Sequence, residues 1–391
     1  MLAVRCPGCA AATGSRHGDD FERYQLRTAP STDWYVRPDT HGEWHPATVP
    51  PMRPASYVPR MPPKRPDPWT PSAEQMALWP EISGNTINGV GEARVRQPSP
   101  IYWHTPEATA HGKLQLWFYS RMTPTVLQAR EERMQAMEEP VAPLSAEVVQ
   151  RSAAEWTQAV KDAALAIGAD AVGITRMQPQ WVYEGCEVSQ QWVVVLCVKH
   201  NWDALQTAPA DTAAAEVIRQ YGRGIRVAKR VAGFLQGHGH AATPHGGPLA
   251  MPMLLLPAAI AAGLGELGRH GSLINRKLGS NLRLACVLTD LPLVADIPDD
   301  FGADDFCAKC QACTIACPPQ AIGPDKRVVR GVEKYYVDFD KCLPFFNESQ
   351  GCAVCLASCP WNLPGVADNL VVKLATRRAQ KANTRAASAH L

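Results

Sequence analysis

The sequence predicts an α+β protein in which a sheet with flanking helices, over residues 146–300, is followed by a small cysteine-rich module over residues 301–365. Three observations carry this prediction. Helix-like and strand-like apolar patterns alternate through the middle of the chain. Two closely spaced cysteine runs follow them near the C-terminus. Most of the 34 prolines lie in the first 145 residues, which are therefore expected to form less regular structure than the rest of the chain.

Length and composition place broad limits on the protein. The 391 residues are enough for two or three domains, and a hydrophobic content of 46% provides material for a buried core. The formal net charge of +2 gives no electrostatic reason to expect a nucleic acid or a membrane as partner. The longest apolar run, 248–264, is interrupted by Pro252 and Pro257 and is shorter than the ~20 residues of a membrane span. No export signal is visible at the N-terminus, so we expect a cytoplasmic protein.

Residues 1–145 are interpreted as an N-terminal arm rich in proline and tryptophan. The prolines are densest over 50–71, where helix formation is unfavourable because proline removes a donor and restricts its neighbour. Disordered segments seldom contain many aromatic residues, so the arm is expected to wrap over the main body and pack its rings there. Its tryptophans are Trp34, Trp44, Trp69, Trp79, Trp103 and Trp117. Regular structure is expected to begin near Ser145.

The core, 146–300, contains the alternating elements. An amphipathic helix is predicted from Ser145 to Gly168, and a long helix with one apolar face over 212–236. Short strands are predicted over 171–175 and 192–198 because these runs are apolar and β-branched. The remaining predictions are a glycine- and histidine-rich loop over 238–247, a buried helix over 249–263, a buried strand over 283–289, and a basic C-terminal tail over 366–391 that frays from Lys373.

The cysteine runs indicate two [4Fe–4S] clusters in a bacterial-ferredoxin-like module. The first run is Cys307-x2-Cys310-x2-Cys313-x3-Cys317-Pro318, and the second is Cys342 followed by Cys352-x2-Cys355-x3-Cys359-Pro360. In two-cluster ferredoxins the fourth cysteine of each run reaches across to the other cluster. The ligands predicted for the first cluster are Cys307, Cys310, Cys313 and Cys359, and those for the second are Cys342, Cys352, Cys355 and Cys317.

Zinc and disulfides are the alternatives for these cysteines. Zinc sites usually show paired CxxC units, whereas each run here ends in three spacer residues, a cysteine and a proline. The pattern therefore favours iron–sulfur clusters, and electrons are expected to move through the protein.

Several segments of the core resemble those of the corrinoid-dependent reductive dehalogenases. The most specific is 263–275, which reads GLGELGRHGSLIN, together with VLTDLPL at 287–293. The other matching segments are 168–174, 215–221, 278–283 and 359–362. The resemblance covers roughly residues 150–365. It implies a nitroreductase-like core that holds cobalamin base-off above the first cluster. The absence of an Asp-x-His-x-x-Gly motif agrees with that binding mode.

The resemblance also implies which residues face the cobalamin. Glycines let the backbone approach a large flat ligand closely, so the glycine-rich segment is the candidate cradle. The residues are Gly263, Gly265, Gly268, His270, Gly271 and Gly279. The alternative is that these glycines serve tight turns and helix packing, and that the histidine is a solvated loop residue.

Tyr221 is the candidate proton donor, because a tyrosine on this helix has that role in the family. A free tyrosine keeps its proton to about pH 10, and a nearby cation favours the phenolate that remains after proton transfer. Arg269 is the first choice for that cation, followed by Arg276 and then Lys277. The alternatives are a core aromatic at Tyr221 and a structural ion pair between Arg269 and Glu266.

The resemblance implies a small organohalide substrate, such as an aryl halide. An external electron donor is expected, either a ferredoxin or a flavodoxin, because the sequence lacks the flavin and ferredoxin module of larger catabolic members. Epoxyqueuosine reductases share the cofactors and act on tRNA, but their Gly-Arg-Asp-Tyr-His run reads GRGIR at 222–226, with Gly224 in place of the acid. A two-cluster electron-transfer protein without catalysis is the other alternative.

Overall fold

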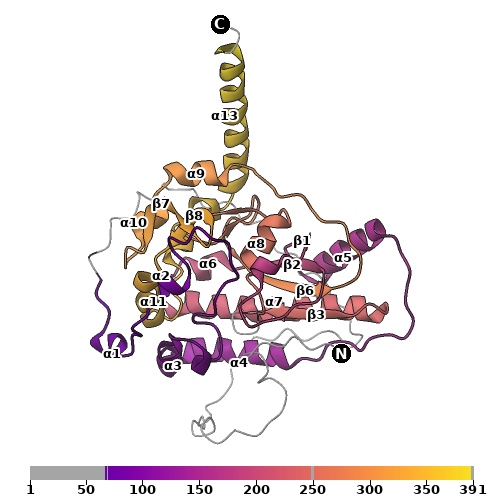
Figure 1. Cartoon of the computed structure of the whole chain (residues 1–391), viewed down its shortest axis with the longest axis horizontal. Helices are drawn as coiled ribbons and strands as arrows, with labels where there is room; N and C mark the ends of the chain where they lie inside the picture. Colours follow the sequence, from indigo (N-terminus) through magenta and orange to yellow (C-terminus); the bar gives the residue numbers. More distant parts are fainter. Residues whose placement is uncertain (1–66, 68, 248–250, 389–391) are drawn as a thin grey trace, which may run out of the picture. The chain divides into compact units, whose positions relative to one another are not determined.

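A four-stranded antiparallel sheet organises the middle of the chain (Figure 1). The structure is a computed structural model that describes residue 67 and residues 69–247 and 251–388. The strand order is β1-β2-β6-β3, and every neighbouring pair is antiparallel. The strands are β1 (Ala171–Arg176), β2 (Trp192–Lys199), β3 (Ala242–Gly246) and β6 (Leu282–Thr289). Three of the four were predicted within one residue at each end.

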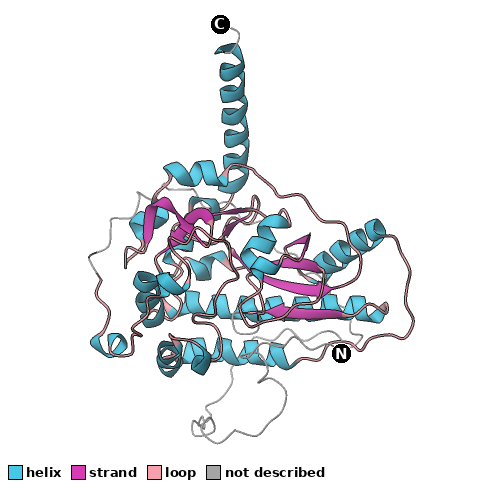
Figure 2. Cartoon of the chain, in the orientation of Figure 1, coloured by secondary structure: helices cyan, strands magenta, loops and turns pink. Residues whose placement is uncertain are grey.

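Both faces of the sheet are buried, which explains why β2 is a continuous apolar run. Alternate residues of a strand point to opposite faces. Val194 and Leu196 pack with α7 (Asp211–Gly237) and α5 (Ala153–Ile167), whereas Val193 and Val195 pack with α8 (Leu255–Ala261). A further helix, α4 (Pro124–Glu138), lies along α7, as Figure 2 shows.

α5 and α8 are shorter than the helices predicted over 145–168 and 249–263. α5 begins at Ala153 because Ser152 and Glu155 form a capping box, and it ends at the predicted Gly168, whose φ is 116°. The predicted loop at 238–247 instead contains β3. A proline within this strand, Pro244, is tolerated because β3 is an edge strand.

The expectation that regular structure begins near Ser145 is wrong. The region before it contains α1 (Ala73–Met76), α2 (Gly84–Ile87), η2 (Pro106–Ala108), α3 (Gly112–Ser120) and α4. α4 has a clear start, since the Thr123 side chain accepts from the Val126 amide at 3.4 Å and Pro124 occupies the first turn. Residues 125–138 are then mostly good helix formers.

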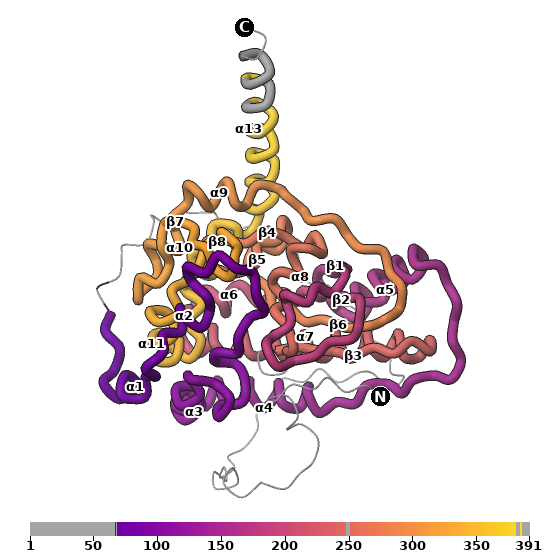
Figure 3. Tube along the Cα trace, in the orientation of Figure 1, coloured from indigo at the N-terminus to yellow at the C-terminus, as the bar shows by residue number. Residues whose placement is uncertain are grey.

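The tryptophans of this region pack on the main body, as expected for those that the structure describes. Trp69 lies edge-on to Phe345 at 5.0 Å, and Trp103 to Phe346 at 5.9 Å. Both phenylalanines belong to α11 (Phe339–Glu348), beside which the N-terminal segment runs in Figure 3. Trp34 and Trp44 lie outside the described residues.

The cysteine-rich module is built from short elements. In chain order they are α9 (Ala303–Lys309), α10 (Ala312–Ala316), the hairpin β7 (Ile322–Val329) and β8 (Val332–Val337), α11, α12 (Val354–Ala357) and η4 (Pro360–Asn362). The remaining elements are η3 (Pro179–Trp181), α6 (Trp202–Leu205), β4 (Glu266–Leu267), β5 (Leu273–Ile274) and α13 (Val366–Ser388).

The C-terminal tail is helical rather than frayed. α13 extends to Ser388, well beyond Lys373. The segment is rich in alanine, leucine, lysine and arginine and has no glycine or proline, so its intrinsic helix propensity is high. Arg378 anchors it through Asp300 at 2.8 Å and Asp305 at 2.9 Å.

Candidate functional site

Eight cysteines of the module are free thiols that gather in two sets. Cys307 and Cys359 share one hydrophobic cluster, and the Cys359 thiol is also close enough to Cys310 and Cys313 for their charges to interact. Cys317, Cys342 and Cys355 share another, which Cys313 also joins, and Cys352 interacts with Cys317 and Cys342. The fourth cysteine of each run thus lies with the other run.

Burial makes it unfavourable for each of these thiols to lose its proton when no metal is bound. Burial raises the pKa of Cys307 to about 11 and that of Cys342 to about 12, and neighbouring thiols add to each rise. A cationic centre bound inside either set would offset both effects. Among the described residues, no three His, Cys, Asp or Glu side chains converge closely enough for a single metal ion.

Backbone geometry around the second set also fits thiolate ligands. The Ala321 amide donates to the Cys317 sulfur at 3.3 Å. Cys352 and Ala353 both have positive φ, at 42° and 62°, a conformation that costs about 1–3 kcal/mol for non-glycine residues. Such strain is retained where the surroundings require it, and here it directs the chain around Cys352.

Arg269 belongs to the module rather than to Tyr221. Its side chain is 1% exposed and donates to the carbonyl oxygens of Cys307, Gly323 and Pro324. The alternative pair with Glu266 does not form either. Glu266 accepts from the backbone amides at the start of α9, including that of Gly302 at 2.7 Å.

Arg276 and Lys277 also have other surroundings. Arg276 pairs with Asp299 at 2.5 Å and lies over the Phe301 ring. Lys277 borders a cavity of about 230 Å³ beside Trp361. The structure therefore does not bring the three predicted cations to the tyrosine.

Tyr221 lies at a small cavity of about 130 Å³, and its cation is Arg283. The Arg283 guanidinium carbon is 5.4 Å from the centre of the Tyr221 ring. Sequence analysis missed this residue, although a signal was present. Arg283 lies opposite Val198 in the sheet, on the face that α7 covers, and Tyr221 is on α7.

The cavity is aromatic and positively charged. Its lining is Trp103, Phe118, Tyr119, Met122, Arg130, Arg133, Ala214, Val217, Ile218, Tyr221, Arg283, Phe346, Gln350 and Gly351. Arg133 is 6% exposed, and its Nε and Nη2 have no hydrogen-bond partner in the described part of the chain. Burial lowers the pKa of Arg133, as expected for a desolvated cation. Three arginines, Arg130, Arg133 and Arg283, line this cavity and no carboxylate of the described residues does, so its charge suits an anion.

The glycine-rich segment contacts protein atoms. A Cβ added to Gly265 would lie 2.1 Å from the Ile274 oxygen, and one added to Gly279 would lie 2.3 Å from the Trp361 oxygen. Their φ values, +149° and +61°, also favour glycine. Added Cβ atoms at the other candidates, Gly263, Gly268 and Gly271, would likewise lie within 3.1 Å of protein atoms. Tight packing thus accounts for these glycines.

His270 is buried rather than solvated. Its Nε2 lies 3.1 Å from the Ser280 hydroxyl, and Nδ1 accepts from the Ser272 amide at 3.2 Å. Burial lowers its pKa to about 4, so the ring is neutral at physiological pH. The histidine holds the turn of the glycine-rich segment.

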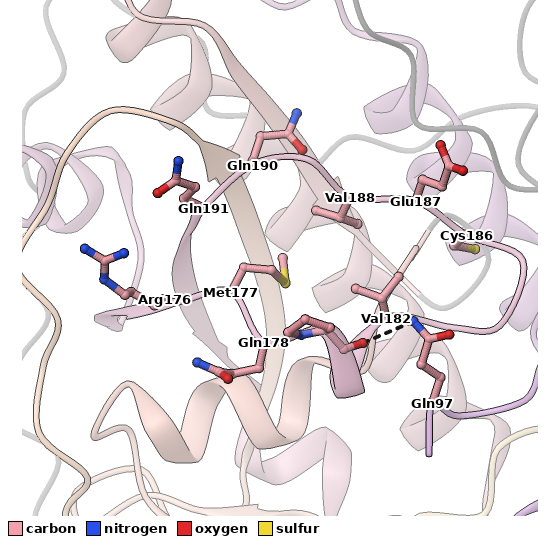
Figure 4. A pocket seen from close by; sticks show the side chains of 11 residues that line it. Gln97, Arg176, Met177, Gln178, Val182, Cys186, Glu187, Val188, Gln190 and Gln191 are labelled. Atoms are coloured by element: carbon pink, nitrogen blue, oxygen red, sulfur yellow. Dashed lines mark hydrogen bonds between the residues drawn. The ribbon is translucent and has the colours of Figure 1, made fainter. Parts of the chain in front are cut away.

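Two further cavities lie in the described structure. The one of about 230 Å³ is bordered by Trp202, Asn281 and Trp361, whose buried Nε1 has no described partner. The other, about 450 Å³, lies at the end of β1 and is ringed by glutamine side chains (Figure 4). It includes none of the eight clustered cysteines.

Comparisons with known proteins agree with this arrangement. Residues 306–363 match the family described as a 4Fe-4S dicluster domain. The tetrachloroethene reductive dehalogenase of Dehalobacter restrictus is 35% identical over 225 residues, which are 54% of this chain and 40% of that protein. A solved catabolic reductive dehalogenase, in complex with 3-bromo-4-hydroxybenzoic acid, has a TM-score of 0.61 at 24% identity and covers 78% of this chain and 49% of its own.

Over these residues the chain is similar in sequence to reductive dehalogenases. It spans well under two thirds of the length of these dehalogenase relatives. The epoxyqueuosine reductase of Leadbetterella byssophila is also similar, at 38% identity, but over 118 residues, which are 26% of this chain and 34% of that protein. In the described portion of the chain, every helix is too short or too polar to cross a membrane.

Proposed function

We propose that the chain is a cobalamin- and iron–sulfur-dependent reductive dehalogenase whose substrate is an aromatic halide with a negatively charged group. The observation that carries this proposal is the pairing of Tyr221 with Arg283 in an aromatic, cationic cavity next to the second cysteine set. Tyr221 and Cys355 pack against the same hydrophobic cluster. A proton donor is thereby close to a source of electrons.

We infer that each cysteine set holds one [4Fe–4S] cluster, with ligands crossed as in two-cluster ferredoxins. The second set adjoins the Tyr221 cavity. We therefore propose that electrons from an external ferredoxin or flavodoxin reach the first cluster and leave from the second. In this proposal the cobalamin lies near the second cluster, whereas the sequence analysis expected it above the first.

The core is proposed to be nitroreductase-like and to hold cobalamin base-off near Tyr221. Support comes from the 230 Å³ cavity, where Asn281 Oδ1 and Trp361 Nε1 have no partner among the described residues and suit a ligand with an amide rim. Trp202 borders that cavity and packs against the same hydrophobic cluster as Tyr221 and Cys355. Neither cavity alone has the volume of a corrin ring, so binding requires side chains to move.

The reaction consumes two electrons and one proton. The carbon–halogen bond breaks, a carbon–hydrogen bond forms, and halide leaves. Cobalamin, when bound, supplies the cobalt centre that brings the electrons to this bond. Tyr221 donates the proton from its hydroxyl group, and Arg283 stabilises the phenolate that remains. Trp103, Phe118 and Phe346 exclude water and hold the aromatic ring.

The charge of the substrate follows from the arginines. A buried guanidinium without a partner is costly, and an anion that accepts its hydrogen bonds removes that cost. Arg133 meets this description, and Arg130 lies at the same cavity. The solved homologue in complex with 3-bromo-4-hydroxybenzoic acid makes that compound a suitable probe.

Epoxyqueuosine reduction is not favoured by the site. Gly224 stands where that family carries its acid, and the residue is buried against the sheet. A Cβ added to Gly224 would lie 3.3 Å from the Ala285 Cβ, which leaves little room for a carboxylate.

The test is bromide release. Protein purified without oxygen and reconstituted with iron, sulfide and cobalamin is given a strong reductant and 3-bromo-4-hydroxybenzoate. We expect bromide in proportion to the debrominated product, and Tyr221→Phe should abolish turnover while the paramagnetic signals of cobalt and both clusters persist. If the protein never retains a corrinoid, or if Tyr221→Phe turns over normally, the proposal fails and an electron relay remains.

A further inference from the structure

Arg269 is a buried cation whose hydrogen-bond partners are uncharged. The acceptors of its guanidinium are three backbone carbonyls, and one of them belongs to Cys307. The guanidinium carbon lies 4.6 Å from the centre of the Tyr335 ring. Within the described chain no carboxylate pairs with it. Glu266 is bonded to the amides of α9, and Asp304 is paired with Lys326 at 2.7 Å.

A buried charge without a counter-charge is strongly unfavourable, and it is retained where an opposite charge is present. A four-iron cube held by four thiolates is negatively charged, and one-electron reduction adds a further negative charge. A cation next to such a cube therefore stabilises the reduced form more than the oxidised form. The first cysteine set is the anion that the position of Arg269 fits.

The interaction is specific to one set. The Arg269 Nε donates to the Cys307 carbonyl oxygen at 3.0 Å, and its guanidinium also donates to the Gly323 carbonyl oxygen in β7. Among the described residues, none of its hydrogen bonds reaches a cysteine of the second set. The two sets thus have different electrostatic surroundings, although their ligands are the same.

We propose that Arg269 is the buried counter-charge of the first cluster and raises its reduction potential relative to that of the second. This inference rests on the two-cluster assignment of the proposed function, but on neither the corrinoid nor the substrate. An external reductant supplies the electron, the first cluster accepts it, and no proton or ligand is exchanged. Arg269 therefore acts through its charge on the first cluster. It does not contact the substrate.

The experiment is a redox titration of the anaerobic, iron-loaded full chain without corrinoid, followed by paramagnetic resonance. Arg269→Met and Arg269→Gln remove the charge, and the glutamine amide can still donate to the Cys307 carbonyl. We expect at least a tenfold decrease in the equilibrium constant for reducing one cluster, which is about 59 mV, and no change for the other. Arg269→Lys should recover most of the loss.

The matched control is Arg276→Met on the same loop. Arg276 is already neutralised by Asp299 and is partly exposed, so its removal should leave both potentials unchanged. If both neutral variants lose iron while Arg269→Lys keeps it, the charge is required for the cluster, which supports the proposal. Arg269 would have a purely mechanical role if the potentials are unchanged in the neutral variants or if Arg269→Lys shifts the potential equally. Loss of iron in all three variants would lead to the same conclusion. Dehalogenation can fail without affecting any of these results.

Discussion

Replacing Arg133 with methionine should weaken catalysis and at the same time stabilise the protein. Methionine matches the unbranched stem of arginine as far as Nε and keeps the packing of that stem, but it removes the rest of the guanidinium and its charge. The Arg133 guanidinium is buried, and two of its nitrogens have no partner among the residues that the structure describes. Both nitrogens lie next to Gly247, 2.9 and 3.0 Å from the position of a Cβ added there, and the same side chain lines the Tyr221 cavity. If Arg133 binds the charged group of the substrate, as proposed, these nitrogens form that contact.

The magnitude follows from this arrangement. A hydrogen bond to a charged group contributes about 1.5–3 kcal/mol, and ~1.4 kcal/mol is a factor of ten. We therefore expect kcat/KM for 3-bromo-4-hydroxybenzoate to fall about 10- to 100-fold in Arg133→Met. A neutral halide such as bromobenzene should lose little. Without substrate, removal of an uncompensated buried charge should raise the free energy of unfolding by about 1–4 kcal/mol.

The assays are bromide release with both substrates and denaturant unfolding of the substrate-free protein. Arg219→Met is the matched control, because Arg219 lies two residues before Tyr221 on α7 but is partly exposed and pairs with Glu132 at 3.1 Å. Its removal should change stability by less than about 1 kcal/mol and should not alter the preference for the anion. Equal losses for the two substrates, or a destabilised Arg133→Met protein, would refute the reasoning.

Three further predictions concern stability. Burial lowers the pKa of His270 from 6.5 to about 4, so the unfolded chain binds a proton that the folded chain does not. The free energy of unfolding should fall by up to ~3 kcal/mol as the pH drops between these values, and His270→Gln should flatten the pH profile in urea titrations. Glu266→Gln should lower the free energy of unfolding by about 1.5–3 kcal/mol and accelerate iron loss, because the Glu266 carboxylate accepts hydrogen bonds from backbone amides at the start of α9, the helix that contains Cys307. Iron retention equal to that of the wild type would contradict this. Gly279→Ala should lower the free energy of unfolding by more than about 1 kcal/mol, because Gly279 has a positive φ and an added Cβ would overlap with Trp361. Gly237→Ala should leave the free energy of unfolding unchanged or raise it, because an added Cβ there meets no atom within 4 Å.

Much of the core could be predicted because its elements have strong local signals. β2 and β6 are long apolar runs, and α7 presents one apolar face over its length. The edge strand β3 was missed because its residues, Ala-Thr-Pro-His-Gly, have low strand propensity. Its formation depends on pairing with β6, for example Thr243 with Leu288, which a local pattern does not reveal.

The helix α4 shows a second limit of local patterns. The preceding prolines indicated an extended arm, yet one of them, Pro124, occupies the first turn of a helix, where it causes no loss of a hydrogen bond. The helix packs closely on α7, where a Cβ added to Gly222 would lie only 3.2 Å from the Arg133 Cα. A contact between residues so far apart in sequence could not be read from either segment alone.

The two arginines most relevant to function show why spacing alone misassigned them. Arg269 lies in the most family-specific motif, and that made it the first choice for the cation at Tyr221. The turn through Gly268 and His270 directs it instead to Cys307. Arg283 lies in an apolar strand and was overlooked, although strand alternation places it on the face toward α7. In the functions proposed above, each cation has its own negative charge to stabilise: the reduced first cluster for Arg269 and the phenolate of Tyr221 for Arg283. Assigning Arg283 to Tyr221 and Arg269 to the first cysteine set gives the tyrosine a cation and gives the buried guanidinium a counter-charge.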